Sequence, residues 1–215
     1  MSAVLLALVM VSGGFFGAGT ASAAAPPPPA QGRQLITVTA DSYRKTTATL
    51  VAYTAEDGNW VKTYGPWTAH VGKNGIAPPG RKREGDGRTP SGTYGFDFMF
   101  GVKPDPGVKF PYRQAFSYDK WNDDSASPLY NTWVDSRHAD AGTAPENMVT
   151  IPAYNHGAVI SYNTKDRTPH LGSAIFLHIS STPTTGCVGL PDGELLRLLR
   201  WMDPKHSPQI DIKVA

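Results

Sequence analysis

Glycine and proline interrupt this chain so often that they set the first limit on its fold. The 215 residues include 22 Gly and 19 Pro. Both residue types break helices and mark turns, whereas the many Thr and Tyr residues suit pleated strands. The sequence therefore favours a mostly β, turn-rich protein over a helical bundle. This length fits one domain with a substantial core better than two large domains.

The first 25 residues carry no charge and resemble a signal peptide. An apolar run, Ala3–Val11, precedes a Gly-rich stretch and the cleavage pattern Ala21-Ser22-Ala23. The run lacks the usual preceding Lys or Arg, and the alternative is a membrane anchor, although its second half is only weakly apolar. We expect residues 1–25 to direct export and to be removed.

Four consecutive prolines, Pro26–Pro29, follow this segment. Proline runs form stiff, extended spacers, so residues 26–33 are predicted to be a spacer. The folded domain is then expected to span residues 34–215.

Within that domain, the alternation of apolar and polar residues and the turn signals predict a series of strands. They are expected at Leu35–Thr39, Thr47–Thr54, Trp60–Val71, Thr93–Phe100, Ala158–Asn163, Ala174–Ser180 and Ile210–Val214.

One helix and two long loops complete the predicted domain. The helix is expected to be N-capped by Asp192, to run through Met202 and to end before Pro204. Gly72–Gly92 is predicted to be a loop. Lys103–Pro152 is predicted to be irregular and, because of its length, to serve as a lid or a substrate wall.

Charge and cysteine content narrow the functional classes. With 20 basic and 18 acidic side chains, the formal charge is only +2, so nucleic acid is not an expected partner.

The chain has a single cysteine, Cys187. Exported proteins normally pair their cysteines, so an unpaired thiol is left for chemistry or for an intermolecular bond. A small buried core residue is the alternative interpretation.

The residues around Cys187 favour chemistry. His178 precedes it by nine residues and could accept the thiol proton, and Gly186 permits a sharp turn. The amides around Cys187 and Val188 could then bind an oxyanion. A purely structural His178 is the simpler alternative. A zinc site that adds His170 has little support, because there is no second cysteine and no close pair of ligands.

Four blocks of sequence resemble the catalytic domain of L,D-transpeptidases. They are Gly85-Asp86-Gly87-Arg88-Thr89-Pro90-Ser91-Gly92-Thr93-Tyr94, Ser161-Tyr162-Asn163, Gly172-Ser173-Ala174-Ile175-Phe176-Leu177-His178 and Thr184-Thr185-Gly186-Cys187-Val188. The resemblance runs from about Ile36 onward. It implies a mostly β, sandwich-like fold with long irregular loops, one helix near the C-terminus and the nucleophile on its floor.

The resemblance also implies roles for individual residues. Cys187 would be the nucleophile and His178 its base, with no metal and no organic cofactor. The group that orients the imidazole is often a main-chain carbonyl or a serine in this family. Ser180 and His170 are candidates for it.

The chain departs from the commoner family pattern beside the nucleophile. Thr185 and Gly189 occupy positions where the family more often has His and Arg. Their contribution to binding would have to come from other residues, such as the basic segment Arg81–Arg88, with Arg88 foremost, or Arg137. Thr185, Ser180, His170 and Arg88 are therefore the candidate substrate contacts.

The implied function is cross-linking of peptidoglycan stem peptides through a thioester on Cys187. The partners would be a donor tetrapeptide and an acceptor amine, carbapenem-type lactams would be covalent inhibitors, and the enzyme would act as a monomer in the cell envelope. Hydrolysis of the same thioester, which is L,D-carboxypeptidase activity, remains open. A non-catalytic wall-binding domain is disfavoured, because binding alone does not need a thiol.

Overall fold

The computed structural model describes residues 30–215. The predicted signal peptide, residues 1–25, lies outside this range, as does the first half of the predicted spacer, residues 26–29. Within the range, the chain is mostly β with one α-helix, as the sequence predicts. No helix among these residues has the length and hydropathy needed to cross a membrane.

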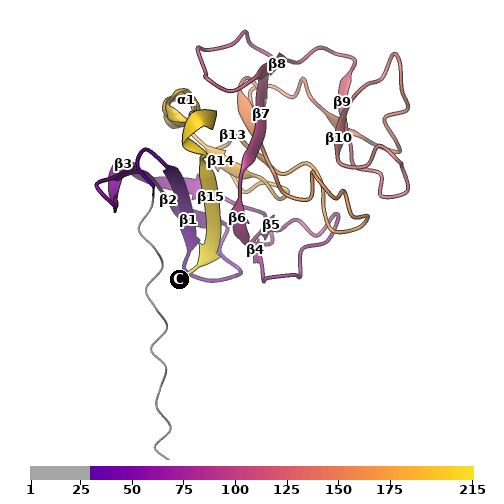
Figure 1. The fold of residues 1–215 in the computed structure, drawn as a ribbon. Helices are drawn as coiled ribbons and strands as arrows, with labels where there is room; N and C mark the ends of the chain where they lie inside the picture. The colour runs from indigo at the N-terminus through magenta and orange to yellow at the C-terminus, as the bar shows by residue number, and fades with distance from the viewer. Residues whose placement is uncertain (1–29) are drawn as a thin grey trace, which may run out of the picture.

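Ten strands of the described region form one mixed sheet (Figure 1). In sheet order they are β6 (Gly92–Tyr94), β15 (Gln209–Val214), β1 (Gln34–Ala40), β2 (Thr47–Glu56), β3 (Asn59–His70), β14 (Val188–Leu190), β13 (Phe176–Ile179), β12 (Gly157–Ile160), β7 (Phe96–Gly101) and β8 (Tyr112–Gln114). The C-terminal strand β15 pairs in parallel with β1, so the first and last strands of the domain lie side by side.

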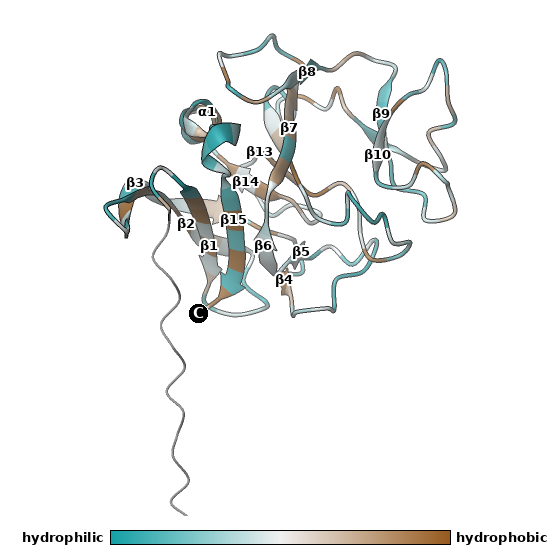
Figure 2. Ribbon diagram, in the orientation of Figure 1, coloured by the Kyte–Doolittle hydropathy of each residue, from teal (hydrophilic) through white to brown (hydrophobic). Residues whose placement is uncertain are grey.

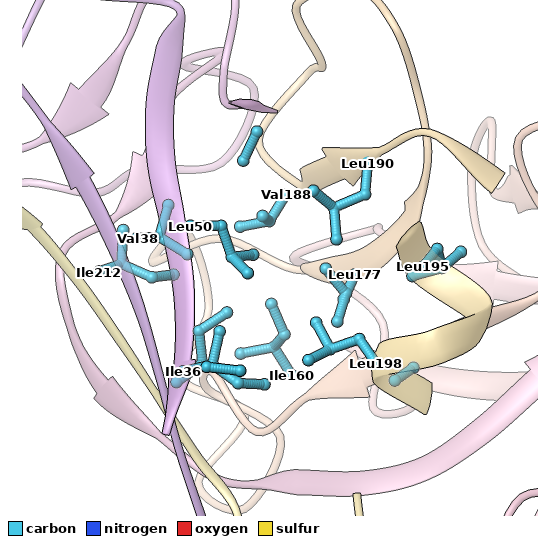
Figure 3. Close-up of a cluster of buried hydrophobic side chains, with 14 of the residues drawn as sticks. Ile36, Val38, Leu50, Ile160, Leu177, Val188, Leu190, Leu195, Leu198 and Ile212 are labelled. Carbon is cyan, nitrogen blue, oxygen red and sulfur yellow. The ribbon is translucent and has the colours of Figure 1, made fainter. Parts of the chain in front are cut away.

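The sheet curls on itself to enclose a hydrophobic core. In β1, buried and half-buried residues alternate, which directs Ile36 and Val38 inward. The same alternation is visible as changing colour along β15 in Figure 2. These side chains pack in one cluster with Ile160 and Leu177, from strands in the other half of the sheet (Figure 3). Contact between strands distant in sheet order requires the sheet to fold over, which confirms the predicted sandwich-like arrangement.

A second core lies on the other side of β12 and β13. Leu177 faces the first core, whereas its neighbour Phe176 faces the second. Strands buried on both faces are nearly continuous apolar runs, as these two are apart from His178 in β13. The second cluster consists of Phe100, Ala115, Trp121, Met148, Tyr154, Val159, Phe176 and Cys187. The candidate nucleophile therefore belongs to the aromatic core.

The helix α1 (Asp192–Trp201) covers the first core with its leucines, Leu195, Leu198 and Leu199. The sequence predicts this helix, but the predicted N-cap, Asp192, lies one residue after the observed one. The Pro191 carbonyl accepts the first helical hydrogen bonds, from the N–H groups of Glu194 and Leu195. Pro191 is therefore the N-cap, and no side chain caps the helix. A 3-10 turn, η1 (Pro204–His206), follows α1.

The region predicted to be irregular contains a small sheet. Its strands, in order, are β10 (Thr132–Asp135), β9 (Asp119–Asn122) and β11 (Glu146–Asn147). The predicted loop 72–92 likewise holds a short pair, β4 (Ile76–Ala77) and β5 (Thr89–Pro90). Strands of two to four residues show too little alternation to be recognised in the sequence.

Candidate active site

Two adjacent strands bring Cys187 and His178 to the same face of the sheet. Strands β13 and β14 run in parallel, with Leu177 opposite Val188 and His178 opposite Gly189. Because side chains alternate along a strand, Leu177 and Val188 both point into the first core. Cys187 immediately precedes Val188, so it points to the opposite side, as His178 does.

The Cys187 thiol is held by the main chain. Its residue is 5% exposed. The sulfur accepts a hydrogen bond from the Phe176 N–H at 3.3 Å and donates one to the Ala174 carbonyl at 3.2 Å. Burial, and to a lesser degree the negative charges of Glu146 and Asp123, raise the pKa of the Cys187 thiol to about 12, against the opposing effect of the Phe176 amide. The resting nucleophile is therefore a neutral thiol.

The His178 ring is oriented by its neighbour's main chain. Nδ1 lies 2.9 Å from the carbonyl oxygen of Ile179. A carbonyl can only accept, so Nδ1 carries the proton and Nε2 keeps the lone pair that a base needs. Burial lowers the pKa of His178, which keeps the ring neutral. The ring also packs edge-to-face on Tyr154 at 5.3 Å.

The orienting group that sequence reasoning left open is thus placed by the geometry at the Ile179 carbonyl. Ser180 bonds instead to the Thr182 carbonyl at 2.7 Å, and His170 is exposed. Within residues 30–215, no hydrogen bond joins the His178 ring to the Cys187 sulfur.

The turn before the nucleophile depends on Gly186. Its φ is +154°, and a Cβ at this position would lie 3.2 Å from the Arg88 carbonyl oxygen. The Gly186 N–H donates to the Thr184 hydroxyl at 3.2 Å. In the described part of the chain the Cys187 N–H has no acceptor, and Val188 lies in β14. The Cys187 amide is therefore the stronger candidate donor to an oxyanion.

Thr89 connects the upstream glycine-rich block to the nucleophile. Its fully buried hydroxyl accepts from the Gly72 N–H at 2.8 Å and donates to the Cys187 carbonyl at 3.1 Å. Thr184 donates to the same carbonyl at 2.7 Å. Sequence reasoning missed this role, although the block containing Thr89 was the signal. The glycine-rich block therefore fixes, through the Thr89 hydroxyl, the backbone of the block that contains Cys187.

A cavity of about 160 Å³ opens beside the thiol. It is lined by Lys82, Glu84, Gly85, Asp123, Glu146, Tyr154, Ser173, Ala174, Ile175, Thr185, Gly186 and Cys187. Of the four predicted substrate contacts, Thr185 lines it, and Ser180, His170 and Arg88 do not. The carboxylates Glu84, Asp123 and Glu146 were missed, because they come from separate segments of the chain and follow no local motif.

The remaining basic candidates lie elsewhere. The Arg88 guanidinium is 3.5 Å from the Ile76 carbonyl, and Arg137 forms an ion pair with Asp135 at 2.7 Å. In the part of the chain that the structure describes, no three His, Cys, Asp or Glu side chains come together to hold a metal. The zinc alternative with His170 therefore gains no support.

The fold and the site define a class: a curled β-sheet protein in which one thiol lines a polar cavity just before strand β14, and one oriented imidazole lies on the neighbouring strand β13. The family model YkuD, the L,D-transpeptidase catalytic domain, matches residues 36–212, and the chain belongs to this family. Nothing among curated proteins or solved structures matches the chain significantly. Family membership supports catalysis of the L,D-transpeptidase type, with peptidoglycan peptides as the substrate class.

Proposed function

We propose that the chain is an exported L,D-transpeptidase that uses Cys187 as its nucleophile and His178 as its base. One observation carries the proposal. In a member of this family, the lone thiol, Cys187, lines a cavity and directly precedes β14, which pairs with the strand that carries His178, and a carbonyl fixes the Nδ1 proton of that histidine. The histidine therefore offers Nε2 for proton transfer.

In the acylation step, the thiol proton passes to His178 Nε2 as the sulfur attacks the carbonyl of the third residue of a tetrapeptide stem. The bond to the terminal D-alanine breaks, and its amine takes the proton from His178. A thioester remains on Cys187. Since the resting thiol donates to Ala174, substrate binding has to turn it toward the histidine.

In the second step, an amine of another stem attacks the thioester, an amide forms and Cys187 regains its proton. If water attacks instead, the same residues act as an L,D-carboxypeptidase. A non-catalytic wall-binding role is the least supported alternative, because it leaves the oriented His178 unexplained.

The proposal is tested by incubating the purified domain with a tetrapeptide stem, with and without an amine acceptor, and weighing both peptides and protein. Cross-linked dimer is expected from transfer, whereas tripeptide alone indicates hydrolysis. Cys187→Ala should abolish the acyl-enzyme mass and His178→Gln should slow its formation at least about 100-fold. Full turnover by either variant contradicts the assignment.

A carbapenem-type lactam provides a second test of the thiol. We expect it to acylate Cys187 and to add its mass to the wild-type protein and not to Cys187→Ala. No adduct on the folded wild-type protein would argue against this type of acyl-enzyme.

Export is proposed from residues 1–25, and the cell wall is the site of action that family membership supports. Expression in a bacterial host should release a mature chain that has lost residues 1–25. A full-length chain retained in the membrane fraction would favour the anchor instead.

A further inference from the structure

Three carboxyl groups line the cavity beside Cys187: Glu84, Asp123 and Glu146. They come from distant parts of the chain, and Glu146 begins β11 of the small sheet. All three are partly buried. The small sheet and the glycine-rich loop therefore concentrate negative charge next to the nucleophile.

No cation of the protein neutralises this charge. Among residues 30–215, none of the three carboxylates takes part in an ion pair. Lys82 is the one basic residue in the cavity wall, but its ammonium pairs with Asp86 at 2.7 Å and donates to the Arg83 carbonyl at 2.8 Å.

Neutral donors satisfy the carboxylates only in part. The Ser173 hydroxyl lies 2.7 Å from Glu84 Oε2 and 3.2 Å from Asp123 Oδ1, and its single proton cannot serve both at once. The Tyr154 hydroxyl donates to Glu146 Oε1 at 3.2 Å. Glu84 is the best satisfied of the three, because it also accepts from the Tyr130 hydroxyl and, at 3.2 Å, from the Gly85 N–H. Asp123 and Glu146 have fewer donors and keep free acceptor capacity.

In the protein without ligand, these carboxyl groups are in an environment that disfavours their charged forms. Burial and the neighbouring charges of Glu146 and Glu84 raise the pKa of Asp123 to about 7, and burial raises the pKa of Glu146. A bound cation would relieve this repulsion. Buried charges in proteins are usually paired, so an uncompensated group of this kind favours a positively charged ligand.

A second, independent observation identifies the place as a ligand site. The same cavity wall carries Cys187, the proposed nucleophile, and the cavity of about 160 Å³ is large enough for an ammonium group on a short alkyl chain, since one water molecule needs only about 10–15 Å³ measured in the same way. We propose that Glu84, Asp123 and Glu146 form a subsite that binds an ammonium group of the peptide substrate next to Cys187.

This inference rests on the proposed function, and it names the chemistry that the site selects. Two sources could supply the ammonium group: the side-chain amine of the donor's third residue, or the amine of the acceptor. Both are primary amines that are protonated in solution at neutral pH. An acceptor that binds as the ammonium ion gives its proton to His178 Nε2 before the free amine attacks the thioester. The experiment has one arm for each.

The donor arm uses two tetrapeptides that differ only in a free or an acetylated side-chain amine at the third residue. The isosteric variants Asp123→Asn and Glu146→Gln remove charge and keep shape, and Glu56→Gln removes an exposed charge at the far end of β2 as a matched control. We expect the first two variants to lower the ratio of kcat/KM for the free-amine peptide to kcat/KM for the acetylated peptide about tenfold or more, because any change that they make to the reactivity of Cys187 affects both peptides alike.

The acceptor arm starts from an acyl-enzyme formed with the acetylated donor and measures the ratio of aminolysis to hydrolysis. We expect Asp123→Asn and Glu146→Gln to lower this ratio about tenfold if the acceptor is the source. Glu56→Gln should leave it unchanged. A charge-specific loss in either arm supports the subsite, and equal effects on charged and neutral substrates in both arms overturn it.

Binding to Cys187→Ala, measured by calorimetry with the same two tetrapeptides and with the amine acceptor, separates this inference from the proposed function. If the protein prefers an ammonium-bearing peptide and Asp123→Asn abolishes the preference, the subsite stands even where no acyl-enzyme forms. If wild-type Cys187 is acylated but neither arm nor the calorimetry depends on charge, the function stands and the subsite is wrong.

Discussion

Replacing Asp123 with Asn should stabilise the free protein, and by an amount that depends on pH. The pKa of Asp123 is raised from 3.8 to about 7 by burial and by two neighbouring carboxylates. One pKa unit corresponds to about 1.4 kcal/mol, so ionised Asp123 costs the fold about 4 kcal/mol above pH 7. The folded state binds the proton more tightly than the unfolded state, so this part of the stability is present below pH 3.8 and is lost as the pH rises to 7.

The measurement is urea denaturation of wild type and Asp123→Asn between pH 4 and pH 8. The difference in unfolding free energy should change in favour of the variant by up to about 4 kcal/mol over this range and should stay constant above pH 7. Asn differs from a protonated Asp in hydrogen bonding, which adds an offset independent of pH. Parallel stability curves for the two proteins would refute the reasoning. Glu56→Gln serves as the control for general charge effects.

Three further outcomes are expected. Thr89→Val leaves the buried Gly72 N–H unpaired and should lower the unfolding free energy by about 1–3 kcal/mol, whereas Thr89→Ser should restore most of it in denaturant titrations. The rate of alkylation of Cys187 by iodoacetamide should rise about tenfold per pH unit from pH 7 to pH 9, because burial raises the pKa of the thiol to about 12. A plateau in this rate near pH 8 would contradict a buried, neutral thiol. Leu177→Ala should lower stability by about 2–5 kcal/mol, against less than about 0.5 kcal/mol for the exposed Val61→Ala; similar losses in the two proteins would speak against the first core.

Local patterns were enough to predict the long strands and the helix. Alternation places Ile36 and Val38 inward along β1, and the spacing of Leu195 and Leu199 predicts the buried face of α1. Such patterns are visible because they repeat within one element. The short strands β9, β10 and β11 escaped prediction, because pairing with distant segments and not local alternation makes them strands.

The sequence by itself determined that the chain has one thiol, that His178 and the glycine turn at Gly186 accompany it, and that the whole resembles one enzyme family. These are properties of neighbouring residues. It could not show that Thr89 holds the Cys187 carbonyl, because 98 residues separate the two and only the curled sheet brings them together.

The tertiary structure alone decided the environment of the thiol. Glu84, Asp123 and Glu146 are ordinary surface residue types in the sequence. They become a partly buried group of acids only because the separate segments that carry them converge on one cavity. Charge interactions depend on distance and burial and not on position along the chain. Burial, with a smaller contribution from Glu146 and Asp123, keeps Cys187 protonated at rest.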